Sequence, residues 1–541
     1  MLKRLAIVLL VSSLSESAAL AANYFVSPGG GDNNDGSALH PWQTLQHAAD
    51  QVIAGDTVTV LAGTYVGFSL GWNNPQSGAF GMPITFQAQP GVLINQVNPN
   101  TQDGIDLEGS SWIIVDGFEV TAAGRAGIRT VSDGVTNATN VIVRNNYCHD
   151  NKEWGIFTSH VDNLLITNNR ASNSMVQHGI YVSNACVNPT VRGNRIWGNY
   201  AAGLHMNGDI SQGGTGVITG ALIEQNVIYG NGAGGGSGIN CDGVQSSIFR
   251  NNLIYDEHAS GMSLYQIDAA QPAIDNVVVN NTIVVASDGR WALNINSGST
   301  GNTAYNNILL NLNPNHGSIQ IAADSLPGFT SDYNAVVDRF TADQGNTFID
   351  FATWKAMTGQ DAHSFISDAA SLFMGNGDYH LSPTSPAIDK GTPMDAPSVD
   401  LDGTPRPQGN GYDVGAYEYC PNGACAALSL DMGAPIDMSI VPVNNDMSTV
   451  PGNNDMIVPL DLGVPIRDII FVIDEFPPSD GGTKAHDFAL ANSDASVVGG
   501  GTAPAGCGCR VGARGGSLRS MAIAVLLLSS LFLRRRRGRL E

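Results

Sequence analysis

Apolar and polar residues alternate with a period of two in many short segments between residues 104 and 322. One such segment begins with a small and an apolar residue and returns every 23 to 35 residues. Its copies are GIDLE (104–108), GIRTV (127–131), GIFTS (155–159), GIYVS (179–183), GLHMN (203–207), GINCD (238–242), GMSLY (261–265), ALNIN (292–296) and SIQIA (318–322). This alternation is typical of β-strands, so the pattern predicts one such strand per repeat.

A second recurring segment lies between these strands and ends in asparagine. Its copies are VIVRNN (141–146), LLITNN (164–169), PTVRGN (189–194), ALIEQN (221–226), SIFRNN (247–252), VVVNN (277–281) and TAYNN (303–307). Two short strands per turn of about 25 residues predict an all-β fold, a right-handed parallel β-helix or solenoid. Because asparagine tolerates a left-handed corner and stacked amides can bond along the axis, we expect a structural ladder. Its members would be Asn146, Asn169, Asn194, Asn226, Asn252, Asn281 and Asn307.

The third and fifth residues of each strand in the first set are expected to face solvent, since the second and fourth are apolar or small and point inward. Stacked from turn to turn, these outward residues would line one continuous face. They are Phe157 and Ser159, Tyr181 and Ser183, His205 and Asn207, Asn240 and Asp242, Ser263 and Tyr265, and Asn294 and Asn296, flanked by Trp154, His178 and Asp209. An aromatic and polar strip of this kind suits an extended sugar chain, although an ordinary solvated sheet face has the same pattern.

Both ends of the chain predict export. Lys3 and Arg4 precede the apolar run LAIVLLV, and ALAA at 19–22 offers a cleavage site, so residues 1–22 indicate a secretory signal peptide. The apolar segment 520–533 is followed by four arginines and is shorter than the roughly 20 residues that span a bilayer. With CGC at 507–509, this ending resembles the C-terminal sorting signals of myxobacterial surface proteins. The resemblance implies cell-surface display and the sorting machinery of the envelope as a partner.

The region between the two ends divides into four parts. Residues 23–100 are expected to form an N-terminal cap and the first turns, with a helix whose apolar face is Leu45, Ala48, Ala49, Val52 and Ile53. Residues 101–340 are the β-helix repeats, and 341–420 form a closing module. Residues 421–506, in which Asp-Met recurs four times, predict an acidic low-complexity tether before the sorting tail at 507–541. We expect a monomer.

Composition narrows the possible partners. The 541 residues are 43% hydrophobic and 13% charged, with a formal charge of −23. Residues 1–22 and 510–541 hold ten of the 25 basic and two of the 48 acidic side chains, which leaves 15 basic and 46 acidic, a charge of −31, between them. This charge argues against nucleic acid or an anionic membrane as partner. Acidic side chains outside a cell often bind Ca²⁺, but they also serve solubility.

The seven cysteines show no zinc-site spacing. Cys420 and Cys425 lie close together, and in an exported chain they are expected to form a disulfide. Cys148, Cys186 and Cys241 are either small buried hydrophobic residues, or one bridge with one cysteine left over.

The entrance of the predicted β-helix, from YFVSPGGGDNNDG (24–36) to GMPITFQAQPG (81–91), resembles that of secreted polysaccharide lyases, especially the family 9 pectate lyases. Residues 385–419 resemble the closing module of bacterial surface β-helix proteins. The first resemblance implies a lysine base and aspartate-bound calcium. By residue type, the nearest matches are Lys152 with Asp150, Asp209 and Asp242.

A polysaccharide lyase needs a base that removes the C5 proton beside a uronate carboxylate, and a cation that stabilises the resulting charge. Lys152 is the one lysine within residues 101–340. His178 and His205 are alternative bases, and Arg129 could neutralise the carboxylate. Each of these side chains could instead be surface polarity or a turn hydrogen bond. The candidate sugar-binding residues are Trp154, Phe157, Tyr181, Asn207, Asn240 and Tyr265.

β-Elimination on a uronate-containing polysaccharide is therefore the favoured hypothesis, and a non-catalytic glycan-binding adhesin is the main alternative. Hydrolysis needs paired carboxylates, for which Asp209 and Asp242 are one conceivable pair. The sequence motifs of polygalacturonases and of alginate epimerases are missing, and CHDN at 148–151 does not replace the epimerase motif. Hydrolysis and epimerisation are therefore less favoured than β-elimination. The surroundings of Lys152 discriminate between the lyase and the adhesin. A position in a groove beside acidic metal ligands favours the lyase, whereas a position in a solvated loop is compatible with the adhesin.

Overall fold

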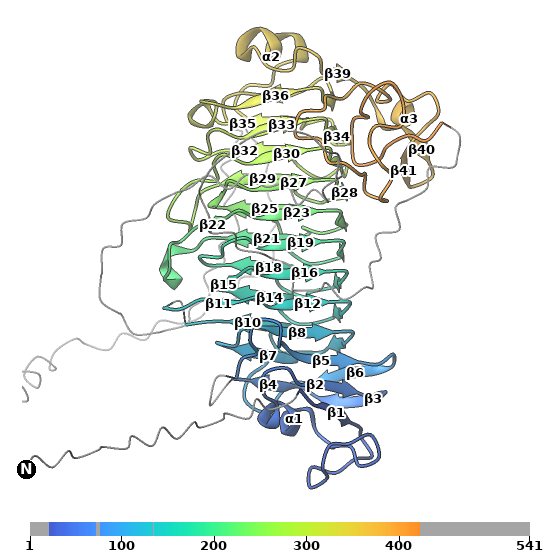
Figure 1. Cartoon of the computed structure of the whole chain (residues 1–541). Coiled ribbons are helices and arrows are strands. Elements are labelled where there is room, and N and C mark those ends of the chain that lie inside the picture. The colour runs from blue at the N-terminus through green and yellow to red at the C-terminus, as the bar shows by residue number, and fades with distance from the viewer. Residues whose placement is uncertain (1–20, 72–75, 134, 422–541) are drawn as a thin grey trace, which may run out of the picture. The chain divides into compact units, whose positions relative to one another are not determined.

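The computed structural model describes residues 21–71, 76–133 and 135–421, which form a right-handed parallel β-helix with three long sheets (Figure 1). Sheet A contains β1 (Asn23–Val26), β2 (Thr57–Val60), β5 (Ile84–Ala88), β8 (Ile113–Asp116), β12 (Ile142–Arg144), β16 (Leu165–Thr167), β19 (Thr190–Arg192), β23 (Leu222–Glu224), β27 (Ile248–Arg250), β30 (Val277–Val279), β33 (Thr303–Tyr305) and β36 (Thr330–Asp332). Sheet B contains β3 (Gly63–Val66), β6 (Val92–Gln96), β9 (Glu119–Thr121), β13 (Tyr147–His149), β17 (Arg170–Ser172), β20 (Arg195–Trp197), β24 (Val227–Tyr229), β28 (Leu253–Tyr255), β31 (Thr282–Val285), β34 (Ile308–Asn311), β37 (Ala335–Val336) and β39 (Phe365–Ile366).

Sheet C carries the first set of repeats found in the sequence. It contains β4 (Phe68–Leu70), β7 (Ile105–Glu108), β10 (Ala126–Val131), β14 (Trp154–Ser159), β18 (Ile180–Ser183), β21 (Leu204–Asn207), β25 (Ile239–Asp242), β29 (Met262–Tyr265), β32 (Leu293–Ile295), β35 (Ile319–Ile321) and β38 (Phe340–Thr341). Smaller elements are β11 (Ala138–Thr139), β15 (Val161–Asp162), β22 (Ile218–Thr219), β26 (Val244–Gln245), β40 (Phe373–Gly375), β41 (Asp378–Leu381), η1 (Ile210–Gln212), η2 (Ala323–Ser325), α1 (Leu45–Gln51), α2 (Phe351–Thr358) and α3 (Ala369–Leu372). No helix among the described residues is long and apolar enough to cross a membrane.

Each turn has three strands rather than the two that the sequence predicts. Sheets A and C are the predicted strands, and sheet B was missed. Many sheet B strands have three residues and turn one side chain inward, such as Cys148 in β13 and Ile196 in β20. A single inward residue leaves no alternation to detect.

The asparagine ladder is confirmed and continues one rung further, to Asn334. The side-chain amide of Asn226, for example, donates to Oδ1 of Asn252 at 3.0 Å and to the Val191 carbonyl at 2.8 Å. The left-handed backbone, however, belongs to the residue before each ladder asparagine, such as Asn251 with φ 51°. In each Asn-Asn pair the first residue therefore forms the corner and the second forms the ladder.

The corner residues also hold the closing module on the β-helix. Asn251 donates to the Val399 carbonyl at 2.7 Å, Asn280 to that of Asp413 at 2.9 Å, and Asn306 to that of Thr392 at 2.7 Å. Inside the module, Arg406 and Glu418 form a fully buried ion pair with Nη1 to Oε2 at 2.7 Å.

The N-terminal helix predicted from the sequence is α1, which buries Leu45, Ala48 and Ala49.

Cys148, Cys186 and Cys241 are buried free thiols, in agreement with the first of the two alternatives. Cys420 is disulfide-bonded, and Cys425 lies outside the described residues. Residues 1–20 of the signal peptide, the tether from residue 422 and the sorting tail also lie outside them.

Candidate functional site

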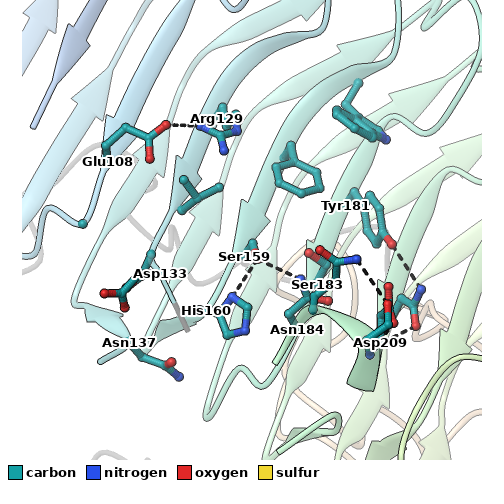
Figure 2. Close-up of a pocket in the computed structure, with 18 of the residues that line it drawn as sticks. Glu108, Arg129, Asp133, Asn137, Ser159, His160, Tyr181, Ser183, Asn184 and Asp209 are labelled. Atoms are coloured by element: carbon teal, nitrogen blue, oxygen red, sulfur yellow. Dashed lines mark hydrogen bonds and ion pairs between the residues drawn. The ribbon is translucent and has the colours of Figure 1, made fainter. Parts of the chain in front are cut away.

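A cleft of about 1100 Å³ lies over the outer face of sheet C (Figure 2). Strands β7, β10, β14, β18 and β21 form its floor, and the segments that follow these strands form one wall. Its lining includes Glu108, Arg125, Arg129, Val131, Asp133, Asn137, Glu153, Trp154, Phe157, Ser159, His160, Tyr181, Ser183, Asn184, Asn207, Asp209, Gln212, Ile267 and Asp268.

The outward residues of sheet C stand in two columns, because parallel strands in constant register stack equivalent positions. The inward part of the prediction is confirmed, because the residues between the two columns, such as Val182 and Met206, are fully buried. The first column is Asp106, Arg129, Phe157, Tyr181, His205, Asn240 and Ser263, and the second is Glu108, Val131, Ser159, Ser183, Asn207, Asp242 and Tyr265.

An aromatic cluster forms the middle of the cleft floor. The ring of Trp154 lies 4.5 Å from that of Phe157 and 6.0 Å from that of Tyr181, and the last two meet edge to face at 5.3 Å. Trp154 and Tyr181 are each 7% exposed, whereas Phe157 is half-buried. All three predicted aromatic residues of this part of the strip therefore meet at one place.

The arginines of the cleft carry their own counter-ions. Nη1 of Arg129 lies 2.8 Å from Asp106 and also pairs with Glu108, while Arg125 pairs with the buried Asp103. Burial raises the pKa of Asp106 to about 7, against the opposing charge of Arg129. Five carboxylates and two arginines line the cleft, so its lining is acidic overall.

Lys152 lies outside the cleft. It is exposed in the segment between β13 and β14, and its backbone bonds to Ala123 and Val176 of neighbouring turns. The next residue, Glu153, does line the cleft, and burial raises the pKa of this carboxyl group. Asp150 sits at the corner after β13, where His149 Nδ1 lies 2.6 Å from its carboxylate.

His178 and His205 are buried behind Tyr181 and are not among the residues that line the cleft. Their rings lie 4.4 Å apart, and that of His205 lies 4.7 Å from Tyr181. Burial lowers the pKa of His205 to about 4, and burial together with His205 lowers the pKa of His178. Both imidazoles are therefore neutral near pH 7.

Most of the expected strip is buried rather than solvent-facing, and in its upper part, from β21 to β29, each outward residue is at most 6% exposed. Residues 209–210 and 268–269 pair over the end of β21, with Ile210 N–H donating to the Asp268 carbonyl at 3.0 Å. Beneath this cover, Asn207 donates to the Tyr181 hydroxyl at 3.1 Å and Asn240 to the Tyr265 hydroxyl at 2.6 Å. Of the three predicted sugar-binding residues in this part, only Asn207 lines the cleft.

The aspartates expected to bind calcium are not gathered at one place. Asp242 is 1% exposed and accepts backbone N–H groups from Ile267, Asp268 and Ala269, so it does not fit a calcium ligand. Asp209 lines the cleft and caps η1 through Ser211 N–H. Within residues 21–71, 76–133 and 135–421, no group of three or more His, Cys, Asp or Glu side chains could hold a metal ion.

Known proteins share this architecture. A family model described as "Pel9A-like, right handed beta helix region" matches residues 24–281, which include the whole cleft. The crystal structure of pectate lyase Pel9A matches with a TM-score of 0.50 at 18% identity, covering 74% of this chain and 97% of that one. These comparisons show a shared fold.

Two further matches are more distant or shorter. The complex structure of XylC with xylose has a TM-score of 0.46 at 11% identity, covering 74% of this chain and 99% of that one. The uncharacterized protein YwoF of Bacillus subtilis (strain 168) is 41% identical over 63 residues, which are 12% of this chain and only 13% of that protein.

The groups on the wall of the cleft were not predicted from the sequence. His160 comes directly after the second column, and Asp133 and Asn137 lie in the segment after β10. A histidine at the end of a repeat, where the adjacent turns have serine, asparagine or glycine, is the one signal that could have pointed to His160.

Proposed function

We propose that the cleft over sheet C holds a segment of a polysaccharide chain, and that the protein is a glycan-binding protein displayed outside the cell. The observation that supports this proposal most strongly is the cluster of Trp154, Phe157 and Tyr181 on the cleft floor, surrounded by amides, hydroxyls and carboxylates. Aromatic surfaces pack against the apolar faces of sugar rings, and these polar groups bond to sugar hydroxyls. The volume exceeds what a drug-sized ligand needs, about 300–1,000 Å³, so several sugar rings fit.

The charges of the cleft favour a neutral glycan. Both arginines are already paired with carboxylates, and Glu108, Asp133, Glu153, Asp209 and Asp268 outnumber them. A polyuronate would meet net repulsion here, added to that of the acidic body, unless Ca²⁺ were bound between them. We therefore propose Ca²⁺ only as a bridging ion for an acidic substrate.

β-Elimination is the second candidate function. The Pel9A-like match spans the entire cleft, and Arg129 stands beside Phe157, where its guanidinium could neutralise a uronate carboxylate. The position of Lys152 on the exposed segment outside the cleft speaks against it as the base. A lyase reaction in this cleft would therefore need a base other than the one that the sequence suggests.

One experiment with two readouts tests both glycan binding and β-elimination. The full chain is run through native gels that contain neutral polysaccharides or polyuronates, with Ca²⁺ or with a chelator, and the same mixtures are followed for absorbance of the unsaturated uronate product. Retardation by a neutral glycan without an absorbance rise supports the proposed binding function. A rise with a polyuronate establishes the lyase instead, and no retardation by any glycan overturns the proposal.

A further inference from the structure

Ser159, at the end of β14 on the cleft floor, and His160, on the cleft wall, form a hydrogen-bonded pair (Figure 2). Ser159 Oγ lies 2.9 Å from His160 Nδ1. Consecutive side chains of a strand normally point to opposite faces, so two such groups meet only where the alternation breaks. It breaks here because His160 has φ 56°, a left-handed conformation that brings its ring to the side of Ser159.

The hydrogen bonds around Ser159 orient its proton toward the histidine. Asn184 Nδ2 donates to Ser159 Oγ at 2.9 Å, which leaves the hydroxyl proton for His160 Nδ1. Burial lowers the pKa of His160, against the opposing effects of the Gly213 carbonyl, Asp133 and Asp162. The imidazole is thus neutral near pH 7 and can accept a proton.

Packing holds the imidazole in place. His160 is 3% exposed, and the Gly213 carbonyl approaches its ring from the segment after η1. Gly214 lies against the same edge, where a Cβ atom would stand 3.3 Å from His160 Cδ2. The histidine is therefore fixed from the side opposite to Ser159.

Neighbouring turns show that the corner itself does not require histidine. In register with Ser159 stand Val131, Ser183 and Asn207, and the residues after these are Ser132, Asn184 and Gly208. Small or amide side chains therefore serve the same corner in adjacent turns. The combination of a serine and a basic imidazole occurs at the turn that lies over the cleft.

We propose that Ser159 and His160 are the nucleophile and the base of an esterase activity that removes acyl groups, such as acetyl esters, from sugar hydroxyls. Ser159 Oγ attacks the ester carbonyl carbon while its proton passes to His160 Nδ1. The bond from carbonyl carbon to sugar oxygen then breaks, and the sugar oxygen takes the proton from His160. Water next attacks the acyl-serine carbonyl carbon and gives a proton to His160, the bond from that carbon to Ser159 Oγ breaks, and Ser159 Oγ takes the proton back from His160 as the carboxylic acid leaves. Asn184 Nδ2 is placed to stabilise the oxyanion.

The natural substrate of this reaction rests on the proposed glycan binding, whereas the chemistry itself does not. The full chain is therefore assayed with p-nitrophenyl acetate, with acetylated xylan, and with a fluorophosphonate probe followed by mass spectrometry of the labelled peptide. We expect labelling at Ser159 and ester turnover. Ser159→Ala and His160→Asn should each lower turnover at least about 100-fold, the usual loss for a base or nucleophile.

Matched variants distinguish a loss of catalysis from a loss of folding. His160→Asn keeps a residue that tolerates the left-handed corner, so its circular dichroism should match that of the wild type. Ser287→Ala alters an exposed serine outside the cleft and should keep full turnover. Absence of labelling at Ser159, or turnover that survives both cleft substitutions, would overturn the esterase. Labelling and p-nitrophenyl acetate turnover without glycan retardation would support it and refute the proposed binding function alone.

Discussion

The asparagine ladder and the outer face of sheet C are built by the same repeat and differ in one respect. Along the ladder every turn places the same residue in the same hydrogen bonds, from Asn146 to Asn307. Along the first column of sheet C, the residue changes from Arg129 to Phe157, Tyr181, His205 and Asn240. Repetition thus identifies the positions that hold the solenoid together, and its loss marks the column in which Arg129, Phe157 and Tyr181 line the cleft.

The largest effect is expected where the ladder is broken. Asn226 accepts from the backbone and side chain of Asn194 and donates to Val191 and Asn252. Asn226→Ala leaves several buried groups unsatisfied, at about 1–3 kcal/mol each, so we expect the free energy of unfolding in urea to fall by about 3–5 kcal/mol. The exposed Asn315→Ala should change it by less than about 0.5 kcal/mol. Equal losses in the two variants would contradict a ladder that stabilises the fold.

A pH-dependent effect is expected at Glu257, which ends a second, shorter ladder in which Asn199 donates to Asn231 at 2.8 Å. Its Oε1 accepts from Asn231 at 3.0 Å, and burial raises the pKa of this fully buried carboxyl group to about 8, from the ordinary 4.5. The folded state then binds the proton more tightly than the unfolded state, so stability falls as pH rises from 4.5 to about 8. Glu257→Gln removes this contribution.

Urea titrations across this pH range measure the difference. The free energy of unfolding should decline more steeply in the wild type than in Glu257→Gln, by up to about 1.4 kcal/mol per pH unit. Other buried carboxyl groups are present in both proteins and cancel in the comparison. Parallel curves for the two proteins would show that Glu257 is ionised in the folded state at no extra cost.

Glycan affinity should depend on the aromatic cluster on sheet C. Phe157→Ala removes the half-buried ring between Trp154 and Tyr181. We expect this variant to bind at least about tenfold more weakly to the glycan that retards the wild type in the native gel, equivalent to about 1.4 kcal/mol. Phe348→Ala is the control, because this ring is 49% exposed and lies outside the cleft. Unchanged affinity in Phe157→Ala would place the binding surface elsewhere.

The smallest effect is expected for Lys152→Ala. The side chain is exposed and outside the cleft, so stability should change by less than about 0.5 kcal/mol and glycan affinity should stay the same. The gel and urea measurements above check both quantities. Loss of an unsaturated-product signal in this variant would instead restore the lysine to a catalytic role.

The sequence predicts the parts of the fold that repeat. The strands of sheets A and C, the two outward columns and the ladder follow from the regular return of one pattern, and the structure confirms them. The residues 209–210 and 268–269 that pair over the end of β21 occur in irregular insertions, so periodicity could not show that most of the strip is buried. Lys152 precedes β14 by two residues in sequence, yet a corner between two sheets turns it away from the cleft.

The Ser159 and His160 pair lay beyond sequence reasoning for a different reason. The alternation rule places adjacent side chains on opposite faces, and it fails at His160 only because its backbone is left-handed. The ion pairs of the arginines could not be predicted from the sequence either. Arg129 could be assigned to an outward position, but its pairing with Asp106 and Glu108 depends on the register between β7 and β10.

The most direct test of glycan binding is a crystal structure of the protein with the longest oligosaccharide of whichever polysaccharide retards it most strongly. The predicted result is a chain of sugar rings over β10, β14 and β18, with at least one ring against Phe157 and hydroxyls bonded to the carboxylates and amides of the cleft wall. An oligosaccharide bound on sheet A or sheet B, with the cleft over sheet C unchanged, would contradict the proposed site.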